Sequence, residues 1–179
     1  MFGLFKKKNG EIKVSEKVVI SEAAKFQAMR SFADTHQPVT FIFWFDDSLR
    51  MAETFLSPSS GQVTLFTARE VQAHHVTGQT VVFGEHYPMR GKEQSLYGKL
   101  GLSSIVIFSS LGEPLFQRFG GDRIIRLMKQ LGIKEDEVIE HKMISNSIRN
   151  AQEKIEKKVI VEQSAHSQKD WIEKNLPAG

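Results

Sequence analysis

Two neighbouring acids, Asp46 and Asp47, directly follow the apolar run VTFIFWF at residues 39–45. Paired carboxylates at the end of a buried strand can hold a magnesium ion. In nucleotide-hydrolysing enzymes they act together with a G-x-x-x-x-G-K-[ST] loop that cradles the phosphates. The sequence contains no stretch with that spacing. We therefore interpret the two acids as capping groups for the helix that follows, and we predict no metal site.

Histidines are the other residues that could support acid–base or metal chemistry. His74 and His75 are adjacent, so they would point about 100° apart on a helix and to opposite faces on a strand, and could not share a metal. His86 stands between Glu85 and Tyr87, which fits either a proton-transfer group in a pocket or a structural role. The chain has no cysteine and no G-x-S-x-G elbow, so thiol chemistry and that type of serine chemistry are absent.

The amino-acid composition limits the classes of function that this chain can have. The 179 residues are 40% hydrophobic, which is enough for one domain with an appended element. The net charge of +3 is spread along the chain, so we expect no nucleic-acid partner. No run approaches the roughly 20 apolar residues of a membrane span. The start MFGLFKKK lacks an apolar signal core, so we expect no export, and at most a weak, salt-sensitive contact with an anionic membrane surface.

Strand-like segments alternate with helical ones along much of the chain. Runs rich in Val, Ile and Phe predict strands at residues 17–20, 39–45, 62–66, 80–83 and 105–108. The runs at 39–45 and 105–108 are apolar throughout, which is typical of strands covered on both faces. Strands that alternate with helices predict an α/β fold with a mostly parallel sheet and helices on both of its faces.

Apolar residues at helical spacing predict the intervening helices. We expect a helix capped by Ser21 and reaching Asp34, a helix with the stripe Leu49, Ala52 and Leu56, a short helix with Leu96 and Leu100, a helix capped by Asp122 and stopped by Gly132, and a helix from Met143 to about Glu162. The run SPSSG at 57–61 predicts a break. No element is predicted beyond the last helix, and the final residues are expected to be loose.

Five runs resemble a known family. They are SEAAKFQA at 21–28, QPV at 37–39, EHYPMRGKEQSLYGKLG at 85–101, SSLGEPLFQRFGGDRI at 109–124 and IEHKMISNSIRNAQEKIE at 139–156. They resemble the second motor domain of the SecA preprotein translocase ATPase family and the start of its helical scaffold. The resemblance implies a RecA-like, P-loop NTPase-type fold and a stand-alone, degenerate homologue of that domain. It divides the chain into a flexible tip (1–16), a motor-like domain (17–142) and a C-terminal helix and tail (143–179).

The catalytic arginines of that family are altered in this chain. The family's QLRGRAGRQGDPG-like run supplies arginines that reach the transferring phosphate. In this resemblance Tyr97 and Lys99 replace the first two, and the third is missing because Leu102 follows Gly101 at once. A lysine keeps the charge but loses the planar fork that binds two oxygens together. The resemblance therefore implies that this chain does not hydrolyse ATP alone and has no tightly bound cofactor, with ATP or ADP binding weak.

Two functions remain open. In the first, the chain is a regulatory module that contacts a translocation ATPase or a preprotein through Arg123 and an apolar stripe that includes Ile144, Ile148 and Ile155. We expect that stripe to be exposed, and the same helix could join two copies in a homodimer. In the second, the chain completes an ATPase site in trans, with Arg90 and Lys99 as residual nucleotide contacts. In either case the resemblance implies a bacterial cytoplasmic location, with peripheral contact at the inner membrane as an option.

Overall fold

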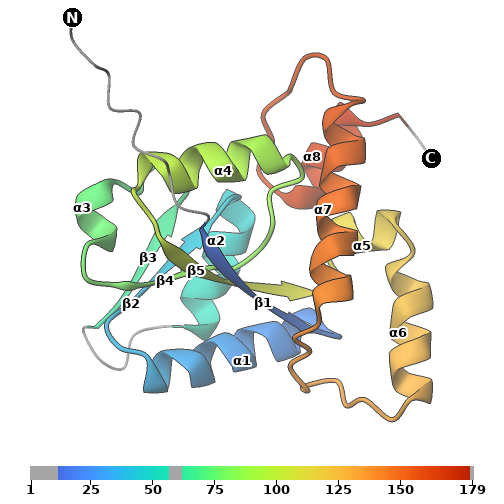
Figure 1. Cartoon of the computed structure of the whole chain (residues 1–179), viewed down its shortest axis with the longest axis horizontal. Coiled ribbons are helices and arrows are strands. Elements are labelled where there is room, and N and C mark those ends of the chain that lie inside the picture. Colours follow the sequence, from blue (N-terminus) through green and yellow to red (C-terminus); the bar gives the residue numbers. More distant parts are fainter. Residues whose placement is uncertain (1–11, 57–61, 178–179) are drawn as a thin grey trace, which may run out of the picture.

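The computed structural model describes residues 12–56 and 62–177. Within these ranges the chain forms a parallel sheet with strand order β1-β5-β4-β2-β3. The strands are β1 (Lys13–Val19), β2 (Val39–Phe43), β3 (Val63–Thr67), β4 (Thr80–Phe83) and β5 (Ser104–Ser110). Helices cover both faces of this sheet (Figure 1). The predicted α/β fold with a parallel sheet is confirmed, and it is consistent with a RecA-like arrangement.

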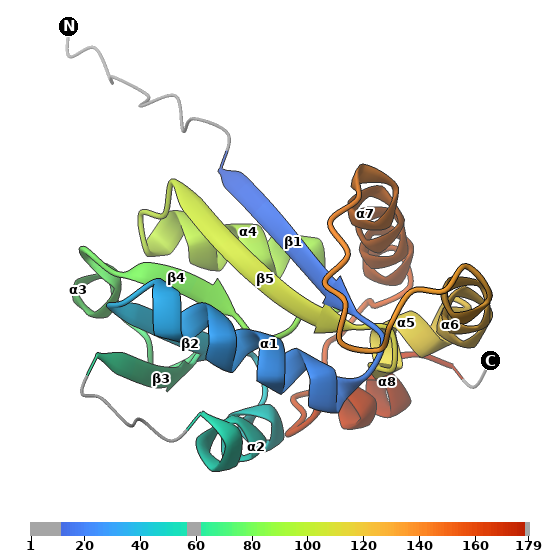
Figure 2. The same ribbon diagram turned by 90° about the horizontal axis from the view of Figure 1, so that it is seen from below.

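The two faces of the sheet bury separate apolar clusters. On one face α1 (Glu22–Thr35) and α2 (Asp46–Phe55) pack over Phe41 and Phe43 of β2. On the other face α3 (Ala73–Val76) and α4 (Arg90–Lys99) pack over Ile42 and Phe83. Figure 2 shows α1 and α2 together on one side of the strands and α4 on the other. Alternate residues of β2 thus point into different clusters, and the whole strand is buried, as its apolar sequence predicts.

The C-terminal helices form a third group beside the carboxyl ends of β1 and β5 (Figure 1). They are α5 (Pro114–Arg118), α6 (Gly121–Gln130), α7 (Lys142–Glu156) and α8 (Gln168–Asn175). Helix α8 was not predicted. Its Trp171 is 0% exposed and packs with Phe45, Leu115 and Ile155, so this part of the tail contributes a core residue. No helix in the described part of the chain combines the length and the apolar character that crossing a bilayer needs.

Several predicted boundaries change in the structure. β1 begins at Lys13, before the predicted start at residue 17, because it pairs with β5 along its whole length, from Lys13 opposite Ser104 onward. α7 ends at Glu156 and not near Glu162, and the chain then turns so that Val159 still packs on the Trp171 cluster. The run at 57–61 and the tip at 1–8 lie outside the described residues, so the break and the membrane contact stay predictions.

Helix capping is only partly as predicted. The Ser21 hydroxyl accepts a hydrogen bond from the Ala24 N–H at 3.2 Å, which confirms that cap. The capping role of Asp46 or Asp47 is wrong. Both acids lie in the first turn of α2, where negative charge is favoured by the helix dipole, and the N-cap position belongs to Phe45. The Asp122 cap is also wrong, because Gly120, with φ of +89°, occupies the N-cap position of α6 and Asp122 lies in the first turn.

A buried charge network connects α1 with the loops that follow β4 and β5. Lys25 Nζ lies 2.8 Å from Glu113 Oε1, and both side chains are buried. Burial would lower the pKa of Lys25, but the charges of Glu113 and Glu85 raise it above its usual value, so the amine stays charged. Glu85 accepts hydrogen bonds from the Trp44 and Phe45 N–H groups and from the Ser48 hydroxyl.

Replacing Lys25 with Met should destabilise the fold by about 3–5 kcal/mol, because Glu113 would then be a buried charge without its partner. Urea unfolding of Lys25→Met measures this, with Lys154→Met on the exposed face of α7 as the control, expected within about 0.5 kcal/mol of the parent. The double variant Lys25→Met with Glu113→Gln should recover part of the loss. If Lys25→Met were as stable as the control, the pair would not hold these elements together.

Candidate functional site

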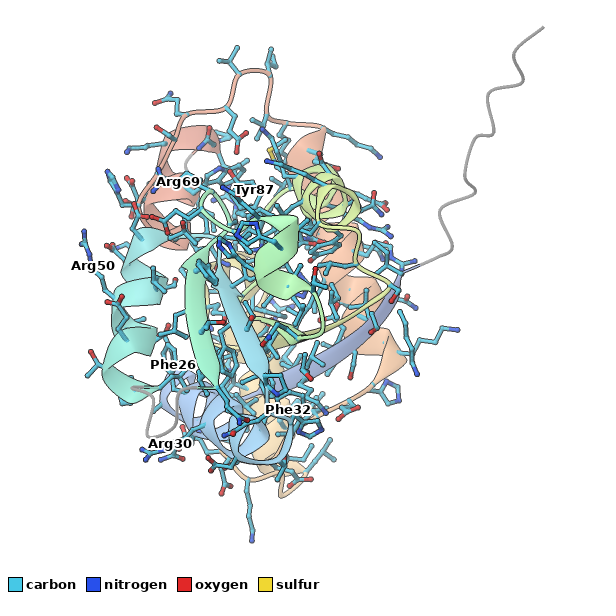
Figure 3. All side chains as sticks on the ribbon, turned by 90° about the vertical axis from the view of Figure 1, so that its left-hand side faces the viewer. Phe26, Arg30, Phe32, Arg50, Arg69 and Tyr87 are labelled. Atoms are coloured by element: carbon cyan, nitrogen blue, oxygen red, sulfur yellow. The ribbon has the colours of Figure 1, made fainter. Side chains whose placement is uncertain are left out.

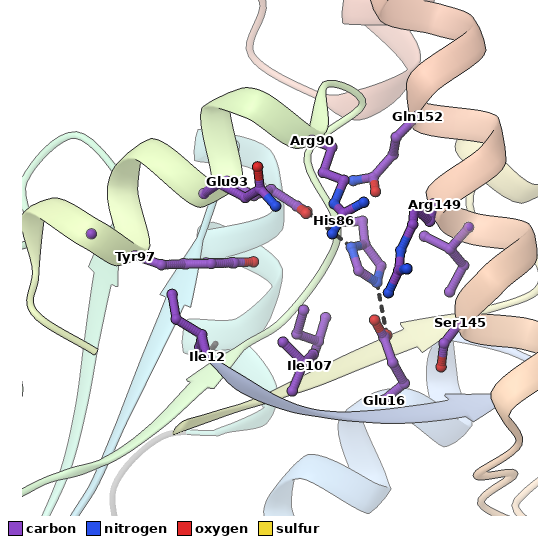
Figure 4. Close-up of a pocket in the computed structure, with 14 residues that line it drawn as sticks. Ile12, Glu16, His86, Arg90, Glu93, Tyr97, Ile107, Ser145, Arg149 and Gln152 are labelled. Atoms are coloured by element: carbon purple, nitrogen blue, oxygen red, sulfur yellow. Dashed lines mark hydrogen bonds and ion pairs between the residues drawn. The ribbon is translucent and has the colours of Figure 1, made fainter. Parts of the chain in front are cut away.

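A polar cleft lies between α4 and α7, with β1 and β5 as its floor (Figure 4). Its volume is about 520 Å³. Helix α4 contributes Arg90, Glu93 and Tyr97, and α7 contributes Arg149. The floor includes Glu16 from β1 and His86 from the loop that follows β4, together with apolar side chains such as Ile107. The cleft therefore combines residues that are up to 140 positions apart in the sequence, from Ile12 to Gln152.

His86 is held between two carboxylates at the floor of this cleft. Its Nε2 lies 2.8 Å from Glu16 Oε2, and its Nδ1 lies 2.9 Å from Glu93 Oε1. Burial lowers the pKa of His86, but the two carboxylates outweigh this effect and raise the pKa well above 6.5. Both ring nitrogens therefore carry protons and donate. Both ring nitrogens are thus occupied by carboxylates of β1 and α4, so of the two roles left open for His86 the geometry supports the structural one.

The loop that carries His86 is fixed by the C-terminal helices. Gln168 of α8 donates from Nε2 to the carbonyl oxygen of His86 at 3.0 Å, and its Oε1 accepts from the Leu115 N–H. Gln152 of α7 donates to the carbonyl oxygen of Tyr87 at 2.7 Å. Because these amide side chains are buried, the position of the loop depends on α7 and α8 being in place.

Three side chains around the cleft are hydrogen-bond donors, and they differ in whether they have a partner. Arg90 pairs with Glu153 at 3.5 Å. Arg149 extends from α7 toward His86 and Glu16 (Figure 4) and makes no hydrogen bond or ion pair with any described residue. The Tyr97 hydroxyl is buried and likewise has no partner within residues 12–56 and 62–177. Burial raises the pKa of Tyr97 well above 10, so this hydroxyl remains a donor.

Lys99 lines a different cavity, of about 290 Å³, on another side of α4. Arg69 and Tyr87, both labelled in Figure 3, also line it. Arg69 pairs with Asp46 at 2.6 Å, whereas Lys99 has no ion-pair partner among the described residues. Arg90 and Lys99 are nine residues apart, which separates them by about 13 Å along the helix and by about half a rotation. The structure does not bring the two predicted nucleotide contacts together.

An apolar groove of about 460 Å³ separates α6 from α7. Several of its side chains are largely exposed, namely Leu127 (51%), Leu131 (67%) and Met143 (71%). The spacing of the α6 residues predicts one apolar helix face, but it does not predict what that face packs against. The sequence holds no signal that α6 stands away from the sheet, so the groove was missed.

The predicted interaction residues occupy different surroundings. Arg123 is exposed at the start of α6, and Ile144 is half-buried at the groove. The expectation that the α7 stripe is exposed is wrong for Ile148 and Ile155, which are 3% and 1% exposed. Ile148 is covered by Leu111 and Phe116, and Ile155 by the cluster around Trp171, so α5 and α8 of the same chain cover the stripe.

Part of this chain is similar to curated SecA proteins. It is 40% identical over 83 residues to the protein translocase subunit SecA of Psychrobacter arcticus, 43% identical over 83 residues to that of Phocaeicola vulgatus, and 39% identical over 83 residues to that of Acinetobacter baumannii. Each match covers 44% of this chain but only 8–9% of the relative. No family model matches the chain. The chain thus contains a SecA-related region and corresponds to less than a tenth of these relatives' length.

The charge on His86 should make stability depend on pH. Because the pKa of His86 is raised in the folded state, its contribution to stability is fully present below about pH 6.5 and is lost as pH rises through the folded-state value. His86→Gln should therefore be less stable than the parent at about pH 6, and the difference should shrink by about pH 9. Urea unfolding at several pH values measures the difference.

Glu85 has its pKa raised by burial to about 7, but it is present in both proteins, so its titration cancels in this comparison. Nitrogen NMR of the His86 ring provides a second measurement and should show two protonated nitrogens at about pH 8. A ring that loses a proton near pH 6.5 would contradict the assignment.

Proposed function

We propose that this chain is a catalytically degenerate, SecA-related module that acts by protein contact in preprotein translocation, in the bacterial cytoplasm and at the surface of the inner membrane. The SecA-related region supports the link to translocation. The observation that carries the contact role is the apolar groove between α6 and α7, because large exposed apolar patches on a folded protein are typical of protein-binding surfaces.

The shape of the groove favours a helical partner segment. Two helices with an apolar trough between them can accept the apolar face of a third, whose residues repeat at i, i+3, i+4 and i+7. Arg123, Arg126 and Lys129 are exposed on α6 and have no partner among the described residues. This side of the groove therefore attracts acidic flanks. We propose an amphipathic helix of the translocation ATPase as the occupant, since the targeting segments of exported preproteins begin with positive charge.

A homodimer through α7 would need the same groove. Ile148 and Ile155 are already covered within one chain, so the apolar part of α7 that remains for a second copy lies around Ile144 and Met143. Self-association is therefore an alternative occupancy of one surface and not a separate function.

Leu127→Glu should weaken binding of the purified chain to purified SecA at least tenfold, because a charge would enter the centre of the apolar surface. Calorimetry of wild type and variant measures the change. Ile160→Glu, at an almost fully exposed residue outside the groove, is the matched control and should bind as the wild type does. Arg126→Glu should weaken binding and reduce its dependence on salt.

Two results would count against this function. One is the absence of binding to SecA at concentrations up to about 100 μM, which is weaker than most specific complexes. The other is unchanged binding by Leu127→Glu. Sedimentation of the free chain distinguishes self-association from binding of SecA. A dimer that forms in the wild type but not in Leu127→Glu would mean that a second copy fills the groove.

A second function, an accessory subunit that completes a nucleotide site in trans, is supported by the Lys99 cavity. Lys92, Lys99 and Arg69 surround it, and Lys99 has no ion-pair partner among the described residues. This function predicts weak ADP binding that Lys99→Gln removes and Arg90→Gln leaves unchanged, since Arg90 lines the other cavity. Calorimetry with ADP and the rate of SecA ATP hydrolysis test it, and no effect on either measurement would exclude it.

A further inference from the structure

We propose that the cleft between α4 and α7 binds a small phosphomonoester, with Arg149 and Arg90 contacting its phosphate group. The site is independent of the protein-contact function, because it lies on the other side of α7 from the apolar groove. It is also separate from the Lys99 cavity, so it does not rest on the accessory nucleotide role.

One of the three cations around the cleft makes no ion pair with a described residue. The charged groups that line it or lie at its rim are Glu16, His86, Arg90, Glu93, Arg149, Glu153 and Glu156. Glu16 and Glu93 share the charge of His86, and Arg90 pairs with Glu153. Glu156 accepts a hydrogen bond from the Gly91 N–H at 2.7 Å. The four carboxylates outnumber the three cations, but Arg149 alone among these cations forms no ion pair with a described residue, and its guanidinium points over the floor (Figure 4).

Two uncharged hydrogen-bond donors of the cleft also lack acceptors in the described part of the chain. The Tyr97 hydroxyl is buried, points toward the cleft (Figure 4) and has no acceptor among the described residues. A buried donor left without an acceptor costs about 1–3 kcal/mol, which an oxygen of a ligand at the floor would remove. The Ser145 hydroxyl also lines the cleft and has no side-chain partner in the described ranges. Donors without acceptors around an unpaired guanidinium are typical of a site for an oxyanion.

Size and the remaining acceptor define the rest of the ligand. A volume of about 520 Å³ falls in the usual range for small-molecule sites and is much larger than a free phosphate needs. Glu16 uses Oε2 for His86, so its Oε1 is available to accept from a hydroxyl group of the ligand. These features together indicate a phosphomonoester that carries hydroxyl groups. Because both nitrogens of His86 are engaged by carboxylates, His86 itself contributes no acceptor to the ligand.

Titration of the purified chain with inorganic phosphate and with glycerol 3-phosphate tests the site by calorimetry and by NMR of the arginine Nε–H groups. We expect saturable binding, at about millimolar Kd for phosphate and tighter for the ester. Arg149→Gln should raise both Kd values at least tenfold. The Kd values of Arg149→Lys should lie between those of the wild type and those of Arg149→Gln, because a lysine keeps the charge but not the planar fork of an arginine. Arg126→Gln on α6 and Lys99→Gln are the matched controls and should bind as the wild type does.

Several outcomes would overturn the proposal. No saturation by about 20 mM of either compound would do so, since that is weaker than a built phosphate site. Unchanged Kd values in Arg149→Gln would do so as well. Loss of binding in Lys99→Gln with normal binding in Arg149→Gln would assign the anion to the other cavity. Arg149 is exposed and unpaired among the described residues, so urea unfolding of Arg149→Gln should match the wild type and separate loss of binding from loss of fold.

Discussion

The loop of residues 85–87 connects the sheet to the C-terminal helices, and the rest of the structure depends on its hydrogen bonds. Glu85 accepts from the backbone at the end of β2, and His86 bridges Glu16 of β1 and Glu93 of α4. The Tyr87 hydroxyl donates to Glu162, and its ring packs edge-on against Trp171 with centroids 5.9 Å apart. Three consecutive side chains thus reach the sheet, α4 and the segment that leads into α8.

This loop determines where α7 can lie. Gln152 donates to the carbonyl oxygen of Tyr87, and Glu156 accepts from the Gly91 N–H at the start of α4. Both bonds fix the distance between α4 and α7, and α8 closes the end of the interface with Gln168 and Trp171. Because α7 is fixed, its two sides face different solvent-filled spaces, with the polar cleft on one side and the apolar groove on the other. One helix position therefore sets the geometry of both candidate sites.

The sheet could be predicted from the sequence because its signal is local. Runs such as Thr80–Phe83 are apolar over the length of a strand, and Leu96 and Leu100 repeat at the period of a helix. The misses concern interactions between distant residues. Trp171 stands in a polar stretch, and only its contacts with Phe45 and Ile155 make α8 part of the core. The local sequence cannot place the two carboxylates that hold His86, because they lie 70 residues before it and seven after it in the chain. Burial of Ile148 likewise depends on α5, which no local pattern places there.

The position of Tyr97 shows how the cations of this chain are arranged. The SecA resemblance places an arginine there, but the ring of Tyr97 packs edge-on against Phe83, with centroids 4.9 Å apart, inside the cluster under α4. A buried aromatic ring at this position supplies no charge to either cavity. Lys99, two residues later, faces the smaller cavity, and Arg90 and Arg149 face the larger one from different helices. The cations therefore do not converge at one place, as binding of a single phosphate chain in a motor site requires.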